Sequence, residues 1–290
     1  MMQFTGNNGK QAELASGTAG DVLDALGMKK GAIAAKIDGC AVDLSRVVER
    51  GGEAAPILPE SDEGLDILRH SAAHLMAQAV AQMYPGTRYG VGPAIKDGFY
   101  YDMEIPGGIT EEDLPKIEKE MHRIAKRSVP VERRVLSKAE ALEWFKAKND
   151  PYKVEIISEL EDETVTLYVQ GEYADLCRGP HVPNTSYVRH FKLLSVAGAY
   201  WRGDEKNIML TRVYGTAFGD EESLAAYIHR MEEAKNRDHR RLGKELDLFS
   251  LQAEGPGFPF FHPKGMVILN NLMDFWKKEH TKRGYCEIRT

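Results

Sequence analysis

Cysteine is scarce in this chain of 290 residues. The three cysteines, Cys40, Cys177 and Cys286, are odd in number and far apart in the sequence. This pattern excludes the disulfide framework of a small secreted domain. We therefore expect each thiol to be inert or to take part in catalysis or metal binding.

Long apolar runs are also missing. No stretch reaches the ~18 consecutive apolar residues of a membrane-spanning helix, and the first residues lack the apolar segment of a secretory signal. Basic residues are not in excess, because 38 Lys and Arg stand against 44 Asp and Glu, a net charge of −6. This balance argues against DNA as a partner, whereas a local basic face would still suit RNA. We expect a cytoplasmic protein with neither DNA nor a membrane as a partner.

The remaining composition is that of a folded protein, with 42% hydrophobic and 28% charged residues. Pro56, Pro59 and the acidic residues 60–63 indicate one linker, and a single basic helix expected over 221–244 indicates another. The predicted organisation is a domain at 1–60, a domain at 61–221, a linker helix at 222–244 and an incomplete domain at 245–290.

The last domain is expected to continue in a longer protein, because the chain ends at 287–290 within a predicted strand. Two origins stay open for such an end. The chain is either a fragment of a larger enzyme or a natural short protein.

An α+β fold is predicted. Residues 1–60 contain a strand at 11–14, a helix capped by Thr18 and a hairpin at Asp38-Gly39, an order typical of the β-grasp fold. A helix over 64–83 follows, and no charged residue lies between His70 and Thr87, so we expect it to be buried on all sides. Later strands are expected around 154–157, 164–169 and 191–196.

A helix expected from Thr110 carries basic residues on its outer side. A solvated face and a contact with RNA are both open interpretations of such a charge run. These residues are Lys116, Lys119, Arg123, Lys126 and Arg127.

Two pairs of residues indicate chemistry. His70 and His74 are four apart on the buried helix, so both imidazoles lie on one face. Cys177 and His181 flank an Arg-Gly-Pro segment that cannot lie within a helix, so we expect a turn after a strand. Asp175, two residues earlier, could orient a histidine or bind a substrate amine.

Three interpretations of these four residues stay open. In the first, they are core residues whose polar groups have hydrogen-bond partners. In the second, His70, His74, Cys177 and His181 form a tetrahedral zinc site. In the third, they form a hydrolytic cluster in which an imidazole activates water. A Cys177 nucleophile is less favoured, because hydrolysis of an ester requires only activated water.

Several motifs, in order along nearly the whole chain, closely resemble bacterial threonyl-tRNA synthetase. The pair of HxxxH and CxxxH motifs is shared with alanyl-tRNA synthetase and with freestanding editing proteins, whereas residues 200–204 and 237–240 resemble the threonyl branch specifically. The motifs are residues 70–75 (HSAAHL), 97–102 (DGFYYD), 152–154 (YKV), 175–183 (DLCRGPHVP), 199–204 (AYWRGD) and 214–218 (YGTAF).

The resemblance implies a ubiquitin-like TGS domain of the β-grasp fold, then an α+β editing domain with a long helix packed on an antiparallel sheet. A linker helix and the start of a class II catalytic domain would follow. The chain ends before the ATP-binding motifs, the zinc ligands of the threonine pocket and the anticodon-binding domain. ATP, Mg, Zn and a homodimer are therefore implied only for the full-length parent, which ligates threonine to its tRNA, and no ligase activity is expected here.

For this chain the resemblance implies proofreading, the hydrolysis of seryl-tRNA made on the threonine tRNA. A pocket built for threonine rejects serine by only about 1–3 kcal/mol, so a second, hydrolytic site improves accuracy. We expect His70 and Lys153 to activate or position water, and His74 and His181 to hold the ester, the ribose hydroxyl or the oxyanion. Asp175 would accept the seryl ammonium group.

Tyr101 and Cys177 would shape the pocket, and no metal is expected. Two alternatives remain, an RNA-binding module without turnover and a structural zinc protein.

Overall fold

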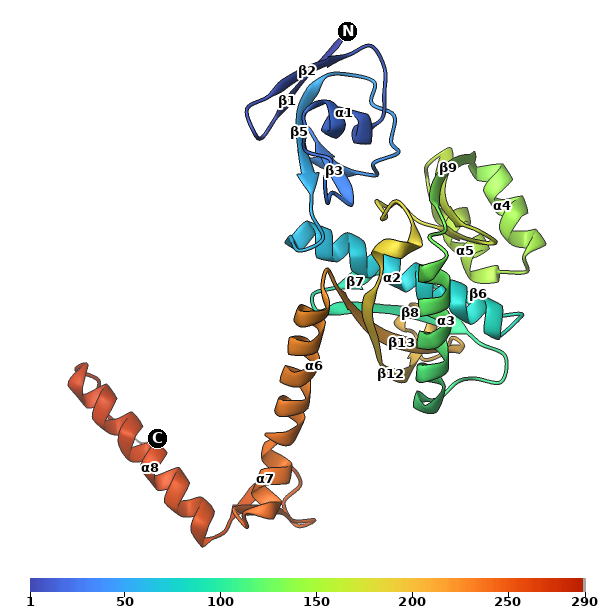
Figure 1. Ribbon diagram of the computed structural model, residues 1–290. Helices are drawn as coiled ribbons and strands as arrows, with labels where there is room; N and C mark the ends of the chain where they lie inside the picture. Colours follow the sequence, from blue (N-terminus) through green and yellow to red (C-terminus); the bar gives the residue numbers. More distant parts are fainter. Residues whose placement is uncertain (289–290) are drawn as a thin grey trace. The chain divides into compact units, whose positions relative to one another are not determined.

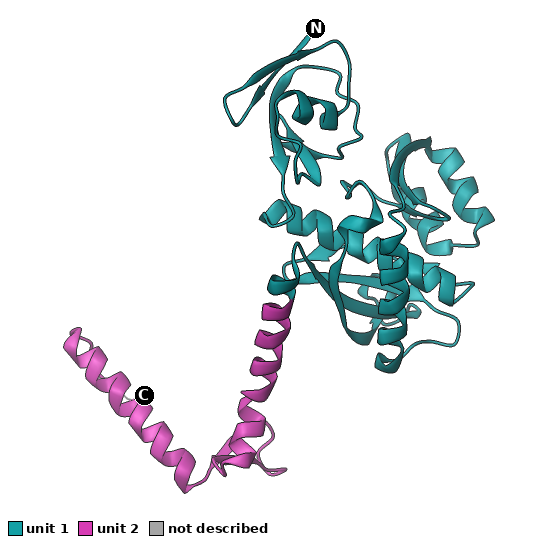
Figure 2. Cartoon of the chain, in the orientation of Figure 1, with its two compact units in different colours: residues 1–224 teal, residues 225–290 magenta. Residues whose placement is uncertain are grey.

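The structure, a computed structural model, describes residues 1–288. The chain divides into two compact units, Met1–Leu224 and Ala225–Thr290 (Figure 2). The first unit contains three sheets, and its mixture of helices with mainly antiparallel strands confirms the predicted fold class at this coarse level. None of the helices in residues 1–288 is long and apolar enough to cross a membrane.

The first 57 residues form a five-stranded sheet in the order β2-β1-β5-β3-β4, with β1 and β5 parallel and the other neighbours antiparallel (Figure 1). Helix α1, Ala19–Ala25, is capped by Thr18, and Val22 and Leu23 pack with Phe4 in the core beneath the sheet. The strands are β1 Met2–Gly6, β2 Gln11–Leu14, β3 Ala34–Ile37, β4 Cys40–Val42 and β5 Gly52–Ile57.

The interpretation of Pro56 as part of a linker is wrong, because Pro56 lies within β5. Only Gly52 to Ala54 of β5 pair with β1. Pro56 lies beyond these pairs, so its lack of a backbone N–H costs no hydrogen bond to β1. The linker after β5 is short, since the next helix is capped by Ser61.

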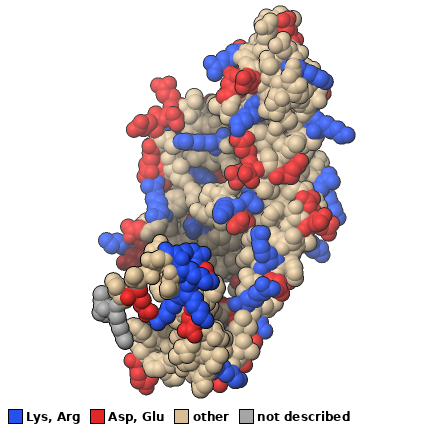
Figure 3. Space-filling model, turned by 90° about the vertical axis from the view of Figure 1, so that its left-hand side faces the viewer, with Lys and Arg blue, Asp and Glu red and all other residues tan. Residues whose placement is uncertain are grey.

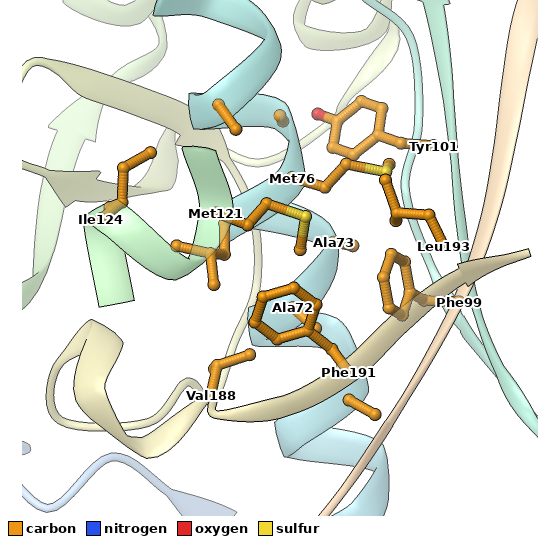
Figure 4. Packing of buried hydrophobic residues seen from close by; sticks show 14 of the residues in the cluster. Ala72, Ala73, Met76, Phe99, Tyr101, Met121, Ile124, Val188, Phe191 and Leu193 are labelled. Carbon is orange, nitrogen blue, oxygen red and sulfur yellow. The ribbon is translucent and has the colours of Figure 1, made fainter. Parts of the chain in front are cut away.

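Helix α2, Asp62–Met83, is the centre of the first unit. It packs against α3, Leu114–Lys126, and against a sheet in the order β12-β13-β8-β6, with β7 also paired to β8. Figure 4 shows Met121 from α3 and Phe99 from β8 around Ala72 and Ala73 of α2. The prediction of a helix buried on all sides is confirmed for residues 71–80, whereas Asp66 and Gln82 near its ends are exposed. The strands are β6 Arg88–Tyr89, β7 Ala94–Ile95, β8 Gly98–Glu104, β12 His190–Tyr200 and β13 Met209–Phe218.

A third sheet of the first unit has the order β11-β10-β9 and its own core with α4 and α5. The strand predicted at 154–157 is wrong, because these residues lie in α5. Asp150 accepts a hydrogen bond from the Lys153 N–H and Pro151 occupies the first turn, so a capped helix start overrides the β-branched run. The elements are β9 Val131–Ser137, α4 Lys138–Ala147, α5 Pro151–Glu159, β10 Thr164–Gln170 and β11 Tyr173–Leu176.

Three short 3₁₀ segments complete the first unit, Glu111–Asp113, Thr185–Tyr187 and Trp201–Gly203.

The second unit begins within α6. The single helix predicted over 221–244 is wrong, because α6 ends at Asn236 and Asp238 caps a new helix by accepting from the Arg240 N–H. The strand predicted at 287–290 is absent at 287–288, and 289–290 lie outside the described residues. The elements are α6 Glu221–Asn236, α7 His239–Glu245, β14 Phe249–Leu251, β15 Pro259–Phe261 and α8 Pro263–Lys282.

Candidate active site

Helix α2 supplies the first two imidazoles of the site. His70 and His74 lie one turn apart, with ring centroids 5.2 Å apart and planes nearly perpendicular. His74 is buried, whereas His70 is partly exposed. The four-residue spacing therefore places both imidazoles on one side of α2, with the His70 ring partly exposed and the His74 ring buried.

The turn after β11 supplies the thiol and the third imidazole. Gly179 has a φ of +71°, a left-handed conformation that suits glycine, and its N–H donates to Cys177 Sγ at 3.2 Å. The turn folds His181 back, so that its Nε2 lies 3.2 Å from Cys177 Sγ. The His70 Nε2 lies at the same distance from the sulfur. The prediction of a turn after a strand is confirmed.

Ser71 holds the third imidazole in place, a role that sequence reasoning missed. Its Oγ lies 3.0 Å from His181 Nδ1 and accepts a hydrogen bond from the Val182 N–H at 3.1 Å. His181 is thereby oriented with Nε2 toward Cys177. A serine beside a histidine carries no signal of such a role.

A buried ion pair lies next to the imidazoles. Lys153 Nζ, from α5, is 2.5 Å from Asp175 Oδ1, and both side chains are 4% exposed. Tyr101 donates a short hydrogen bond to Asp175, and Lys153 donates to the Tyr101 oxygen at 3.2 Å. His74 Nε2 lies 3.6 Å from Asp175 Oδ2. All seven residues that the sequence singles out thus come together from α2, β8, α5, β11 and the turn.

Tyr173 is a second residue that sequence reasoning missed. Its hydroxyl donates to Asp175 Oδ2 at 3.2 Å. The available signal is strand alternation, because residues two apart in β11 point to the same face.

Burial sets the charge state of the site. It lowers the pKa of His70, lowers that of His74 to about 3 and lowers that of His181 well below its ordinary value. All three imidazoles are therefore neutral near pH 7. Burial also raises the pKa of the Cys177 thiol to about 12, so the sulfur is protonated and is a poor nucleophile.

Asp175 stays charged. Burial alone would raise the pKa of this carboxyl, but the charge of Lys153, together with hydrogen bonds from Lys153 and Tyr101, lowers it below its ordinary value. The site therefore combines neutral bases with one buried charge pair.

Two cavities border this cluster. One, of about 380 Å³, is lined by His70, Lys96, Gly179 and Pro180; we call it the His70 cavity. The other, of about 360 Å³, is lined by residues that include Tyr173 and Asp175, and we call it the Asp175 cavity. Among the seven side chains only His70 and Cys177 are partly exposed, so a reacting group reaches the cluster from their side.

The same four donors would fit a metal ion. One ligand atom from each of His70, His74, Cys177 and His181 lies within 4.8 Å of the others. A set of three imidazoles and one thiol matches the chemistry of zinc ligands.

Basic side chains outside the site are mostly mixed with acidic ones. On α3, Lys116 pairs with Asp113 at 2.9 Å and Arg123 pairs with Glu120, which favours the solvated-face interpretation for these two. Figure 3 shows both charges interspersed over most of the face it displays, with one dense group of basic side chains. Helix α8 carries Lys277, Lys278 and Lys282 and is followed by its cap residue Arg283. Lys277 pairs with Glu287, and both Lys282 and Arg283 pair with Glu279.

Comparisons with known proteins agree with the motifs. The family described as "Threonyl and Alanyl tRNA synthetase second additional domain" matches residues 165–214, which include the Cys177 turn. Threonine–tRNA ligase of Carboxydothermus hydrogenoformans is 54% identical over 264 residues, covering 91% of this chain and 42% of that protein. The ligase of Pelobacter propionicus is 52% identical over 282 residues, covering 96% of this chain and 44% of its own length.

The ligase of Clostridium botulinum is 50% identical over 297 residues and is matched by all of this chain. The chain spans less than half of the length of these relatives, between 42% and 46%. It is therefore homologous to threonine–tRNA ligases over a segment shorter than half of those proteins.

Proposed function

We propose that this chain is the amino-terminal portion of a threonyl-tRNA synthetase and that its cluster hydrolyses seryl-tRNA made on the threonine tRNA. The observation that carries the proposal is the convergence of three neutral imidazoles on the buried Lys153–Asp175 pair, beside a cavity that reaches His70. Neutral imidazoles can accept a proton from water at physiological pH.

The proposed domains follow the motifs. Residues 1–60 are a TGS domain of the β-grasp fold, supported by the sheet order and by α1. Residues 61–221 are the editing domain, 222–244 the linker and 245–290 the start of a class II catalytic domain.

In the proposed reaction the terminal adenosine and its seryl ester lie between α2 and the Cys177 turn. His70 and Lys153 activate or position the water, whose oxygen attacks the ester carbonyl carbon while His70 takes up its proton. The bond between that carbon and the ribose oxygen breaks, and the proton passes to the ribose oxygen. His74 and His181 hold the ester, the ribose hydroxyl or the developing oxyanion.

The remaining side chains select the substrate. Asp175 accepts the seryl ammonium group, while Tyr101 and the Cys177 thiol shape the space around the ester. Steric exclusion of one methyl group would distinguish threonine from serine.

We propose that hydrolysis uses no metal. The Lys153 ammonium already supplies positive charge at the site, 2.5 Å from Asp175. A zinc ion held by His70, His74, Cys177 and His181 would supply Lewis-acid chemistry instead. Metal analysis of the purified chain, together with turnover after chelation, distinguishes the two, since only the zinc alternative requires stoichiometric metal.

The other properties of the parent remain proposals. Threonine ligation with ATP, Mg and Zn, a homodimer and a cytoplasmic location belong to the full-length enzyme. This chain alone is proposed to release serine without charging tRNA.

The test is deacylation of seryl-tRNA by the chain and by its His70→Ala and His181→Ala variants. We expect losses of about 10²–10⁴-fold, the range for removal of a general base or its partners. His229→Ala is the matched control, because His229 is exposed on α6. Rates near that of the unmodified chain for both site variants would contradict the assignment. Binding of tRNA without turnover by the unmodified chain would favour the RNA-binding alternative.

A further inference from the structure

Asp43 reaches the candidate site from the N-terminal sheet. It follows β4 directly and is 7% exposed. Its Oδ1 accepts a hydrogen bond from the His181 backbone N–H at 2.8 Å. Its Oδ2 accepts one from the Tyr168 hydroxyl at 2.7 Å. One carboxylate thus binds both His181 and Tyr168, which lie 138 and 125 positions further along the chain.

Both partners of Asp43 belong to the framework of the catalytic turn. The Tyr168 ring packs on the His181 imidazole, with centroids 4.4 Å apart. The Tyr168 hydroxyl also lies so close to Gly179 that a Cβ there would come within 1.9 Å of it. Asp43 therefore fixes His181 directly at its backbone and indirectly through the ring beneath it.

These bonds have no replacement within the described contacts. The His181 N–H and the Tyr168 hydroxyl are buried, and a buried donor without an acceptor is costly. A carboxylate bound by two donors is also stronger and more directional than a neutral acceptor. Loss of Asp43 would let the turn move, and His181 Nε2 would move relative to Cys177 and His70.

The N-terminal sheet is anchored independently of this carboxylate. Ile33 and Ile57 share one apolar core with Leu68 of α2, and Lys36 pairs with Glu63. The contact at Asp43 is therefore separable by mutation from the packing that joins the sheet to α2.

We propose that Asp43 is a positioning residue for the hydrolytic site, so that the N-terminal sheet sets the placement of His181. This inference rests on the proposed function. It assigns to the first 60 residues an indirect part in ester hydrolysis, through a side chain that positions His181 and does not touch the substrate.

The experiment compares seryl-tRNA deacylation by the full chain and by Asp43→Ala, Asp43→Asn and Ile33→Val variants. We expect Asp43→Ala to lower kcat by about 10- to 100-fold, as small misplacements of catalytic groups do, with a much smaller change in KM. Asp43→Asn keeps an acceptor for the His181 N–H and should restore most of the loss. Ile33→Val is the matched control, because it loosens the packing of the N-terminal residues on α2 without touching the turn, and its kcat should stay close to that of the unmodified chain.

A second readout does not need turnover. The imidazole NMR signals of His181 should shift in Asp43→Ala and not in Ile33→Val. Should Asp43→Ala fail to fold, Asp43→Ser takes its place, since a serine is too short to reach both donors. An active parent chain with Asp43→Ala or Asp43→Ser as active as Ile33→Val would overturn the role of Asp43 alone. A folded parent chain without any turnover would contradict the proposed function instead.

Discussion

Lys153 and Asp175 form an ion pair in a place with almost no water. Both side chains are 4% exposed, and Tyr101 and Tyr173 complete the shell around the carboxylate. A buried charge that keeps all its partners is tolerated, whereas one that loses its counter-ion is strongly destabilising. The contribution of each of these four residues to the free energy of unfolding therefore depends on the presence of the others.

We expect Lys153→Met to destabilise the chain by about 3–5 kcal/mol, because it leaves the Asp175 carboxylate buried without its counter-ion. Urea unfolding measures this change. Lys116→Met is the control, since its pair with Asp113 is exposed to solvent and should matter little. Equal effects of the two substitutions would mean that burial does not govern the cost of losing the lysine.

The neutral histidines make stability depend on pH. The pKa of His74 is about 3 in the folded chain and near 6.5 when unfolded, because burial disfavours its charged form. Between these values the unfolded state binds the extra proton, so stability is full above about pH 6.5 and falls as pH drops toward 3. The slope approaches about 1.4 kcal/mol per pH unit for such a histidine.

Unfolding at pH 7 and at pH 5.5 tests this dependence, in a range where most carboxyl groups have not yet titrated. A His74→Gln variant should show a shallower slope than the parent. Parallel slopes would contradict a depressed pKa for His74 in the folded chain.

Single residues of the site were predictable where residue type and spacing coincide. His70 and His74 occupy one face of a helix, and Cys177 and His181 flank a segment that can only turn. Ser71 and Asp43 were not predictable in this way. Their contacts with His181 span more than a hundred residues, and they depend on how separate elements pack.

At the scale of elements, the turn after β11 depends on one glycine. Gly179 has a positive φ, and a Cβ there would meet the Tyr168 hydroxyl at 1.9 Å. We expect Gly179→Ala to cost about 2–4 kcal/mol and to abolish most deacylation, because both the backbone and the ring beneath it must shift.

Gly171→Ala separates the two causes. Gly171 also has a positive φ, but the nearest atom to its added Cβ is 3.4 Å away. Only the backbone penalty of about 1–2 kcal/mol should appear in that variant. Equal losses of stability and activity in both variants would remove Tyr168 from the explanation.

Elements with strong end signals were predicted well, and those without them were not. The apolar run at 154–157 resembles a strand, yet Asp150 and Pro151 begin a helix before it, and Ile157 packs against α4. Likewise, the sequence did not predict β5, because Pro56 is typical of a linker. Pro56 is tolerated in this strand because it lies beyond the residues that pair with β1, which only the sheet order shows.

At the scale of the whole molecule, the first unit contains the complete candidate site. The seven predicted residues, Asp43 and both cavities all lie within residues 1–224. A chain of residues 1–224 should therefore fold and deacylate seryl-tRNA with a kcat within about twofold of the parent, since a domain with its own core folds alone. Circular dichroism and single-turnover rates measure the two properties. A folded but inactive truncated chain would show that the second unit contributes to the reaction.

The ranges 1–60 and 61–221, which the sequence separates, both belong to this compact unit. Composition changes mark the linker between them, but they carry no sign that Ile33 and Ile57 pack with α2. Packing between neighbouring modules depends on surface shape, which a single sequence does not express.

The distance along the chain between the parts of the site has a consequence for synthesis. Asp43 and His181 are 138 residues apart, so their contact can form only after most of the first unit has left the ribosome. Contacts of such long sequence separation form late in folding. A nascent chain therefore lacks the Asp43 contact with the His181 backbone until most of the first unit has been synthesised.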